Sequence, residues 1–176
     1  VYGGDDRLYQ NIFLGGTKTY TEQSLNGTAG YDGSPVSLEE YVEEVTALGN
    51  GDVEMFEKVN QPVFINGNAY LKGAPAFARE EDNYLSEGDP QVKISVEGDS
   101  VYLEMNVEKD MLSIPTEIID TEKLGMVRLV EAPFDDPDGN PIVLDKDYLG
   151  KTRKAGSPAG PLEELKEGFN RVKVWG

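Results

Sequence analysis

A short apolar segment that ends in glycine occurs twice in this chain of 176 residues, at residues 11–16 and again at residues 68–73. Both copies place an asparagine first, an aromatic residue third, a leucine fourth and a glycine last. Strands this short cannot bury their inner faces alone and must stack on neighbouring strands. This weak internal repeat therefore predicts a mostly β fold built from stacked parallel coils. We expect one continuous interior, lined by Leu8, Ile12, Phe13, Phe64, Ile65, Tyr70 and Leu71.

Three charged residues, Asp5, Asp6 and Arg7, lead into the first copy of the repeated segment. A carboxylate and a guanidinium held together at the entry of a strand can bind sugar hydroxyls through bidentate hydrogen bonds. The same residues would serve equally as a structural ion pair that fixes the turn. We predict Asp5, Asp6 and Arg7 as candidate substrate-binding residues, with this structural role as the alternative.

The run from Gly3 to Phe13 resembles a late coil of the right-handed parallel β-helix glycosidases related to the glycoside hydrolase family 120 β-xylosidases. Segments at residues 136–141, 145–153 and 158–161 resemble the closing part of bacterial β-helix carbohydrate enzymes. The resemblance implies that this chain is the C-terminal part of a longer, retaining glycosidase. Its two catalytic carboxyl groups would lie in coils that precede residue 1, so no catalytic residue is predicted here.

This interpretation divides the chain into two regions. Residues 1–90 are expected to form the end of a right-handed parallel β-helix, with a pair of helices inserted at about 37–60. Residues 91–176 are expected to form a small antiparallel β layer that closes the β-helix, whose last coil would otherwise expose unpaired strand edges.

The inserted region carries the helical signals. Ser37 and Glu40 are spaced as a capping box, and Gly49 stands where the helix should end. Asp52 can cap a second, shorter helix that ends before Pro62. The apolar face of the first helix comprises Leu38, Tyr41, Val42, Val45 and Leu48, opposite Glu39, Glu40, Glu43 and Glu44. We predict that this first helix lies on the outside with its glutamates in water.

Alternating apolar residues mark the second region. Residues 92–96 and 101–107 flank a turn that contains glycine, and they predict a hairpin with one buried face. Shorter strands are expected at residues 116–119, 126–130 and 142–144, and residues 172–175 are expected to add an edge strand. Residues 135–140 have a calcium-like composition but lack the spacing of a calcium loop, so they predict a plain turn.

The composition excludes several classes of function. With 33 acidic and 16 basic residues the net charge is −17, which makes nucleic acid a poor partner. No segment approaches the ~20 apolar residues that a membrane span needs, so the chain is expected to be soluble. The absence of Cys and His excludes thiolate and His-ligated metal sites and Ser-His or Cys-His pairs. No cofactor or metal is predicted. The composition fits a cytoplasmic bacterial protein and an exported one equally well.

We therefore predict the C-terminal portion of a β-xylosidase-like glycoside hydrolase, inactive when isolated. A stand-alone carbohydrate-binding or structural β domain without catalysis is the alternative. A pectate-lyase-like enzyme, which would need calcium and a base such as Arg7, is a third hypothesis. Partners that fit are a xylo-oligosaccharide, the missing N-terminal β-helix portion or a second chain, and a further copy in a homo-oligomer. Aromatic residues that could stack on sugars are Tyr20, Tyr31, Tyr84 and Trp175, although such scattered aromatics are more often packing residues.

Overall fold

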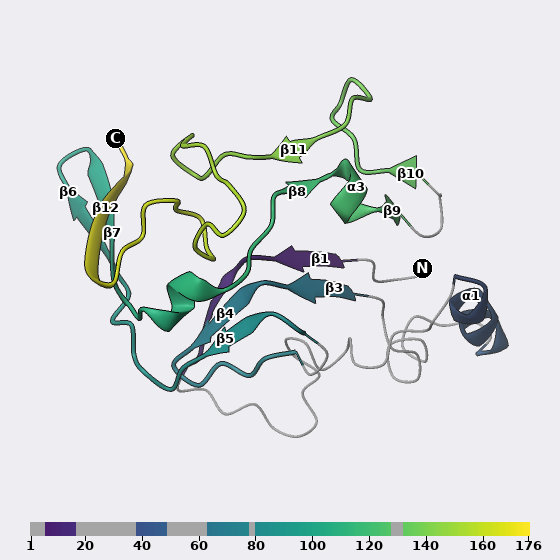
Figure 1. The fold of residues 1–176 in the computed structure, drawn as a ribbon, viewed down its shortest axis with the longest axis horizontal. Helices are drawn as coiled ribbons and strands as arrows, with labels where there is room; N and C mark the ends of the chain where they lie inside the picture. The colour runs from purple at the N-terminus through teal and green to yellow at the C-terminus, as the bar shows by residue number, and fades with distance from the viewer. Residues whose placement is uncertain (1–5, 17–37, 49–62, 78–79, 128–131) are drawn as a thin grey trace.

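The computed structural model describes residues 6–16, 38–48, 63–77, 80–127 and 132–176. Within these ranges the chain is mostly β, with several small sheets and a few short helices (Figure 1). The Asp5 carboxylate, the Ser37 cap and the second predicted helix, which would begin after Asp52, lie outside the described residues.

Five short strands form parallel pairs at the centre of the molecule. Strand β1 (Asp6–Tyr9) pairs with β3 (Val63–Asn66), and β4 (Asn68–Leu71) lies between β2 (Ile12–Leu14) and β5 (Asn83–Leu85). Ile12 stands opposite Ala69 in the register. The two copies of the repeated segment are therefore adjacent parallel strands, aligned position by position, as the sequence predicted.

The asparagine that begins each copy of the repeated segment, and Gly15 of the first copy, hold the two copies together. Asn68 is fully buried, and its Oδ1 accepts hydrogen bonds from the backbone N–H (2.6 Å) and Nδ2 (3.0 Å) of Asn11. Its Nδ2 donates to the carbonyl oxygen of Leu8 at 2.9 Å. A Cβ at Gly15 would stand 2.0 Å from the carbonyl oxygen of Lys72, so only glycine permits this approach of the two chains.

One hydrophobic cluster joins the parallel strands to the C-terminal half of the chain. Its buried members are Ala69, Leu71, Met105, Val107, Met111, Ile114, Ala159, Leu162 and Leu165. Ile12 packs against this cluster, and Ile65 and Tyr70 are also buried, as predicted. Phe64 was expected to line the same interior, and this was wrong: it is 37% exposed, because neighbouring positions of a strand face opposite sides.

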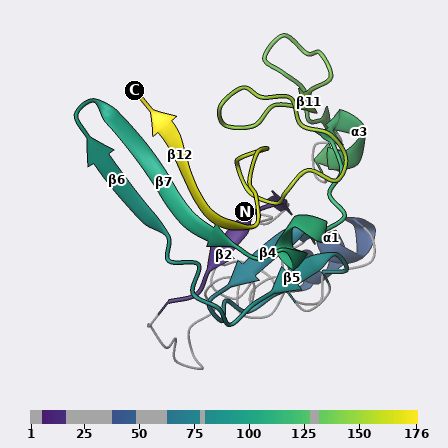
Figure 2. The same cartoon turned by 60° about the vertical axis from the view of Figure 1, so that its left-hand side comes forward.

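An antiparallel sheet, which we call the arm, projects from this core (Figure 2). It comprises β6 (Lys93–Glu97), β7 (Ser100–Val107) and β12 (Gly168–Trp175), in the order β12-β7-β6. The predicted hairpin and C-terminal edge strand are confirmed. The predicted buried face of the hairpin is wrong for β6, where Ile94 is 60% and Val96 72% exposed. Only the part of the arm nearest the hydrophobic cluster packs on it.

The remaining elements are short. The helical turn η2 (Asp110–Ser113) precedes β8 (Ile119–Asp120), α3 (Thr121–Leu124) and β9 (Met126–Val127), and β10 (Ala132–Pro133) and β11 (Val143–Leu144) follow. Strand β8 pairs with β11, and β9 pairs with β10, both antiparallel. Strand β8 starts later than predicted, and residues 128–130 of the strand expected after Met126 lie outside the described ranges.

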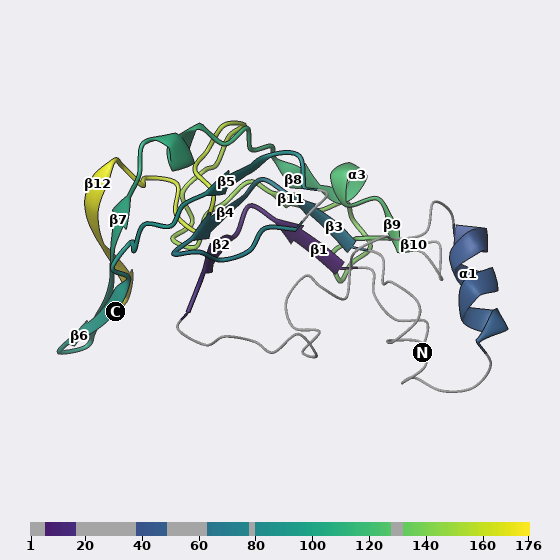
Figure 3. The same ribbon diagram turned by 90° about the horizontal axis from the view of Figure 1, so that it is seen from below.

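The helix α1 (Leu38–Ala47) lies at the end of the molecule opposite the arm (Figure 3). Its glutamates Glu39, Glu43 and Glu44 are exposed, as predicted. The side chains of Leu38, Tyr41 and Val45 are not among those described, so the predicted apolar stripe stays a prediction. Among the described helices, no segment combines the length and apolar character needed to cross a membrane.

Two tight turns of the C-terminal half share one geometry. Asp136 Oδ1 accepts the backbone N–H groups of Asp138 (2.9 Å) and Asn140 (2.8 Å). Asp147 Oδ1 accepts those of Leu149 and Lys151, both at 2.8 Å. Each turn is closed by an antiparallel bridge, Asp135 to Pro141 and Lys146 to Thr152. The first turn confirms the plain turn predicted at residues 135–140, because its carboxylate is used by the backbone.

Candidate functional site

Arg7 connects the first strand to the segment around α3. Its Nε donates to the carbonyl oxygen of Leu124 at 2.9 Å, and its Nη2 donates to that of Met126 at 3.2 Å. The guanidinium also lies 3.8 Å from the ring centre of Phe64 and 4.9 Å from that of Phe134. These contacts give Arg7 a positioning role between β1 and the α3–β9 segment.

Four polar side chains gather beside Arg7 where β1, β3 and α3 meet. Tyr9 stands opposite Asn66 in the register, and Lys123 pairs with Glu117. All four line one small recess. We refer to Arg7, Tyr9, Asn66, Glu117 and Lys123 as the β1 cluster. Its members come from segments that are far apart in the sequence, so only the fold brings them together.

The recess of the β1 cluster is small. Its volume is about 10 Å³, room for one water molecule but not for a sugar ring. Burial raises the pKa of Tyr9, while the charges of Arg7 and Lys123 oppose that shift. The Tyr9 hydroxyl is therefore protonated at neutral pH and can both donate and accept a hydrogen bond.

The Asn66 amide is fixed from the other side by Asp82. Asn66 Nδ2 donates to Asp82 Oδ2 at 2.8 Å, and the Asp82 backbone N–H donates to Asn66 Oδ1 at 2.9 Å. Hydroxyl, amide, ammonium and carboxylate groups held in this way match the alternating donors and acceptors of a carbohydrate. The β1 cluster therefore presents several hydrogen-bond donors and acceptors beside a recess that is too small for a sugar ring.

Proton transfer to a glycosidic oxygen needs a carboxyl group with a raised pKa. Wherever the described residues shift the pKa of a carboxyl group, they lower it. Hydrogen bonds from Ser86 and Tyr84 lower the pKa of Glu108, and a hydrogen bond from Arg171 lowers that of Glu104. These two groups are suited to stay ionised and do not fit the general acid of a glycosidase.

The buried carboxylate of Glu80 is held inside the parallel strands. It accepts hydrogen bonds from the backbone N–H (2.9 Å) and Nδ2 (2.8 Å) of Asn68 and from the Tyr70 hydroxyl (2.6 Å). Burial and the hydrogen bond to Glu80 raise the pKa of Tyr70. Because Glu80 is only 8% exposed and its partners are structural, we assign it to the stability of the strands.

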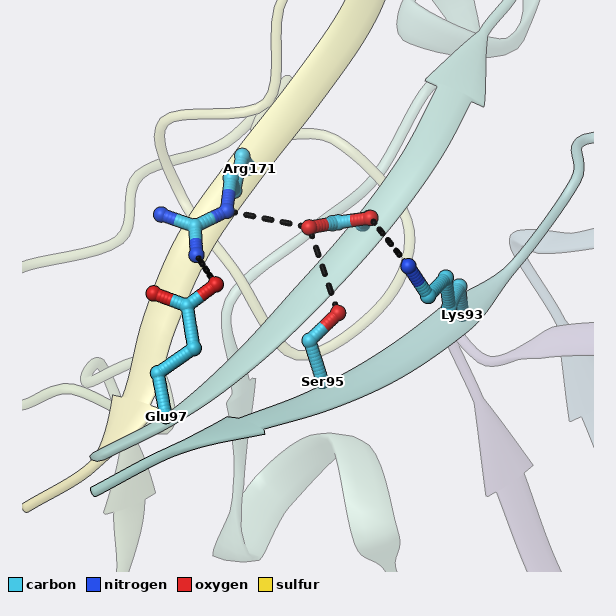
Figure 4. A network of polar contacts seen from close by, with 5 residues as sticks. Lys93, Ser95, Glu97 and Arg171 are labelled. Atoms are coloured by element: carbon cyan, nitrogen blue, oxygen red, sulfur yellow. Dashed lines mark hydrogen bonds and ion pairs between the residues drawn. The ribbon is translucent and has the colours of Figure 1, made fainter. Parts of the chain in front are cut away.

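A second polar network lies on the arm (Figure 4). Arg171 Nε donates to Glu104 Oε1 at 2.9 Å, and Arg171 also pairs with Glu97. Its guanidinium lies 3.7 Å from the ring centre of Tyr102, and Lys93 is 3.8 Å from Glu104. These contacts link all three strands of the arm and keep its polar face in one arrangement.

The structure places the sequence-predicted residues in different ways. Asp6 is exposed at the start of β1, next to Arg7, and Asp5 lies outside the described ranges. The Tyr84 hydroxyl donates to Glu108 Oε2 at 2.8 Å, whereas Trp175 is 70% exposed at the end of β12. Sequence reasoning missed Tyr9 and Lys123, because no local pattern marks contacts made across more than a hundred residues. No group of three or more acidic residues in the described part of the chain is arranged to hold a metal ion.

Comparison with known proteins gives one informative match. No protein-family model and no curated protein matches the chain. A solved structure of XylC in complex with xylose matches 99% of this chain, with 45% sequence identity and a TM-score of 0.78. The chain spans 27% of the length of that XylC chain. This chain is thus similar, in sequence and fold, to one part of a larger protein that was solved with xylose bound.

Proposed function

We propose that this chain is the C-terminal portion of a xylose-related, carbohydrate-active protein, a β-xylosidase-like glycoside hydrolase. The observation that carries the proposal is the 45% identity to XylC, solved with xylose, over 99% of this chain. The chain spans 27% of XylC. We place the catalytic carboxyl groups upstream of residue 1, because the first residues of the chain resemble a late coil of a β-helix glycosidase. Glu104 and Glu108, whose pKa values are lowered by hydrogen bonds, are not suited to act as the general acid.

We further propose that the parallel strands are the last coils of a right-handed parallel β-helix like that of the glycoside hydrolase family 120 enzymes. Parallel pairing of β1 with β3 and of β2 with β4 and β5 supports this, as does the in-phase stacking of the repeated segment. The asparagines at the start of each copy, Asn11 and Asn68, are linked by hydrogen bonds between successive strands. Such side-chain ladders stabilise stacked parallel strands.

Within this proposal, Asp5 and Asp6 are substrate-side residues, and Arg7 positions β1 while also facing the sugar. An exposed carboxylate at a strand entry can accept hydrogen bonds from sugar hydroxyls. Arg7 already donates to two backbone carbonyls, so its removal should affect both the shape of the β1 cluster and sugar binding.

Activity on an aryl β-xyloside tests the proposal. We expect the 176-residue chain alone to hydrolyse it at background rate, because binding residues cannot replace the two catalytic carboxyl groups. We expect turnover when the upstream coils are supplied in the same polypeptide. Robust turnover by the chain alone would contradict the proposal. Xylo-oligosaccharide binding without turnover by the complete protein would favour a carbohydrate-binding module.

Substitutions in the complete protein test the site residues. Asp6→Ala and Arg7→Ala should each lower kcat/KM on the aryl xyloside, because an unpaired sugar hydroxyl in a desolvated site costs ~1 to 3 kcal/mol. Asp138→Ala, an exposed acid in a distant turn, is the control. If both variants retain wild-type kinetics while Arg7→Ala lowers the melting temperature, the role of Arg7 is structural.

A further inference from the structure

A groove of about 470 Å³ is lined by β12 and by the loop that follows β11, and it shares no lining residue with the recess of the β1 cluster. Figure 2 shows β12 at the edge of the arm. The free edge of β12 forms one wall, since β12 is the edge strand of the arm. Residues 147–166 supply the other wall. The volume lies in the range of sites that hold small ligands, which distinguishes this groove from the recess beside Tyr9.

Hydrogen bonds hold both walls of the groove in place. Asp147 accepts the backbone N–H groups of Leu149 and Lys151 on Oδ1, and that of Glu163 on Oδ2 at 2.9 Å. On the other wall, buried Asn170 donates to the carbonyl oxygens of Lys166 (2.7 Å) and Gly168 (2.9 Å). Asn170 Oδ1 also accepts the Lys166 backbone N–H at 3.0 Å. The turn that carries Lys166 and Phe169 is therefore ordered before any ligand binds.

The charges that line the groove are mostly positive, although the whole chain carries −17. The charged lining residues are Asp147, Lys151, Glu164, Lys166, Arg171 and Lys173. Lys151 pairs with Glu164, and Arg171 pairs with Glu97 and Glu104 on the arm. Lys166 and Lys173 have no ion-pair partner in the part of the chain that the structure describes. Two ammonium groups are thus available to an anion.

An aromatic ring stands between these two lysines along the chain. Phe169 lines the groove and is 66% exposed, which is unusual for a residue of this size in a strand. Phe169, Arg171 and Lys173 lie on one face of β12, because alternate residues of a strand share a face. A groove that contains both an exposed ring and two ammonium groups offers stacking for an apolar sugar face and charge for a carboxylate.

We propose that this groove binds an oligosaccharide that carries a carboxylate, with its sugar ring on Phe169 and its carboxylate between Lys166 and Lys173. The inference rests on the proposed carbohydrate function and names the class of ligand: a uronic-acid-substituted xylo-oligosaccharide. The groove would act as a binding subsite away from the catalytic centre, which we place upstream of this chain. An acidic peptide would use the lysines but would not require the ring.

Isothermal titration calorimetry with the 176-residue chain tests this inference. The ligands are xylotriose substituted with methylglucuronic acid, unsubstituted xylotriose, trigalacturonate and tetraglutamate. We expect the substituted xylotriose to bind at least tenfold more tightly than xylotriose, and its affinity to fall with added salt. The double variant Lys166→Gln/Lys173→Gln should lose roughly tenfold in affinity, since a charged hydrogen-bond partner is removed. Phe169→Ala should lose about fivefold for both xylose-based ligands.

The matched control is the double variant Lys109→Gln/Lys154→Gln, which removes the same charge at exposed positions outside the groove. It should bind like the wild type. Equal affinity for substituted and unsubstituted xylotriose, equal losses in both double variants, or no heat up to 10 mM ligand would overturn the inference. If tetraglutamate binds tightly and its affinity is unchanged by Phe169→Ala, the groove is a peptide site instead. If trigalacturonate is the only ligand that binds, the groove is a site for acidic sugars, but the xylose-related function is contradicted.

Discussion

At the scale of single residues, polar side chains decide how the parallel strands of this chain fit together. Asn68 is fully buried, yet its amide is satisfied by Asn11, Leu8 and Glu80. Glu80 in turn accepts three hydrogen bonds from Asn68 and Tyr70. A buried network of this kind stabilises a fold only while every member keeps its partners.

Replacing Glu80 by Ala should therefore destabilise the chain strongly. The Asn68 amide and the Tyr70 hydroxyl would lose their acceptor in a buried site, which at ~1 to 3 kcal/mol per group gives about 3 kcal/mol in the free energy of unfolding. Urea denaturation of the 176-residue chain measures it. Glu81→Ala, at the exposed neighbouring position, is the control and should change stability by less than about 0.5 kcal/mol. Equal effects of the two substitutions would show that the network contributes little.

The pH dependence of stability should depend on Asp147. Burial of its carboxyl group opposes ionisation, but backbone hydrogen bonds from Glu163, Lys151 and Leu149 outweigh burial and lower the pKa. A carboxyl whose pKa is lower in the folded state stabilises the fold above its unfolded pKa, and this stabilisation is lost as the pH falls through the folded value.

Asp147→Asn should consequently lower the melting temperature at pH 7, and the difference from the wild type should shrink as the pH falls from 5 to 3. Melting curves at pH 7, 5, 4 and 3 test this. Asp138→Asn is the control, because Asp138 accepts no hydrogen bond in the described part of the chain. A difference that stays constant with pH would assign the effect of Asp147 to turn geometry alone.

At the scale of elements, the turn at residues 157–161 fits directly against β2. The Gly160 backbone N–H donates to the carbonyl oxygen of Gln10 at 2.7 Å, and Arg153 Nη1 donates to the carbonyl oxygen of Gly160 at 2.8 Å. Ala159 is completely buried beside this contact. The segment at residues 158–161, noted in the sequence for its resemblance to β-helix enzymes, therefore joins the C-terminal half to the first strands.

Gly160→Ala tests how closely these two elements must approach. Gly160 has φ +96°, and an added Cβ would stand 2.5 Å from Ile12 Cδ1. Gly139 has φ +80° with no atom within 4 Å of an added Cβ, so Gly139→Ala shows the backbone strain alone. We expect Gly139→Ala to cost about 1 kcal/mol and Gly160→Ala about 1 to 3 kcal/mol more, measured by urea denaturation. Equal costs would mean that the Ile12 side chain moves aside freely.

At the scale of the whole molecule, the parallel strands and the C-terminal half of the chain share one core. Ala69 and Leu71 from the parallel strands pack in the same cluster as Ala159, Leu162 and Leu165 near the C-terminus. The C-terminal strand β12 also completes the arm by pairing along nearly the whole length of β7. Neither part can bury its apolar surface without the other, so the parallel strands and the C-terminal half should unfold as one unit.

Truncation after residue 156 should therefore abolish cooperative unfolding. It removes three members of the core cluster and the partner strand of β7, and large deletions of core side chains each cost about 2 to 5 kcal/mol. Near-ultraviolet circular dichroism and denaturation curves report the outcome. Truncation after residue 174, which removes only exposed Trp175 and the last glycine, is the control. A sharp unfolding transition in the shorter chain would show that the parallel strands fold without the tail.

The sequence by itself determined the elements whose signals are local. The repeated segment fixed which strands would be parallel neighbours, the capping and glutamate pattern gave the helix after Ser37, and the alternation around Gly98 gave the hairpin. These features depend on the conformational preferences and the apolar pattern of residues that are close together in the sequence, so the sequence predicts them directly.

Only the tertiary structure decided where Arg7 points, which groups surround Tyr9, and that Ile94 and Val96 stay exposed on the arm. It also brought the groove of Lys166, Phe169 and Lys173 against a loop some twenty residues earlier in the chain. The physical reason is that an alternating pattern predicts which face of a strand is apolar. The segment that covers that face is distant in the sequence, so the pattern does not identify it. Charge and burial at a site depend on those distant partners, and their positions are set by the packed fold.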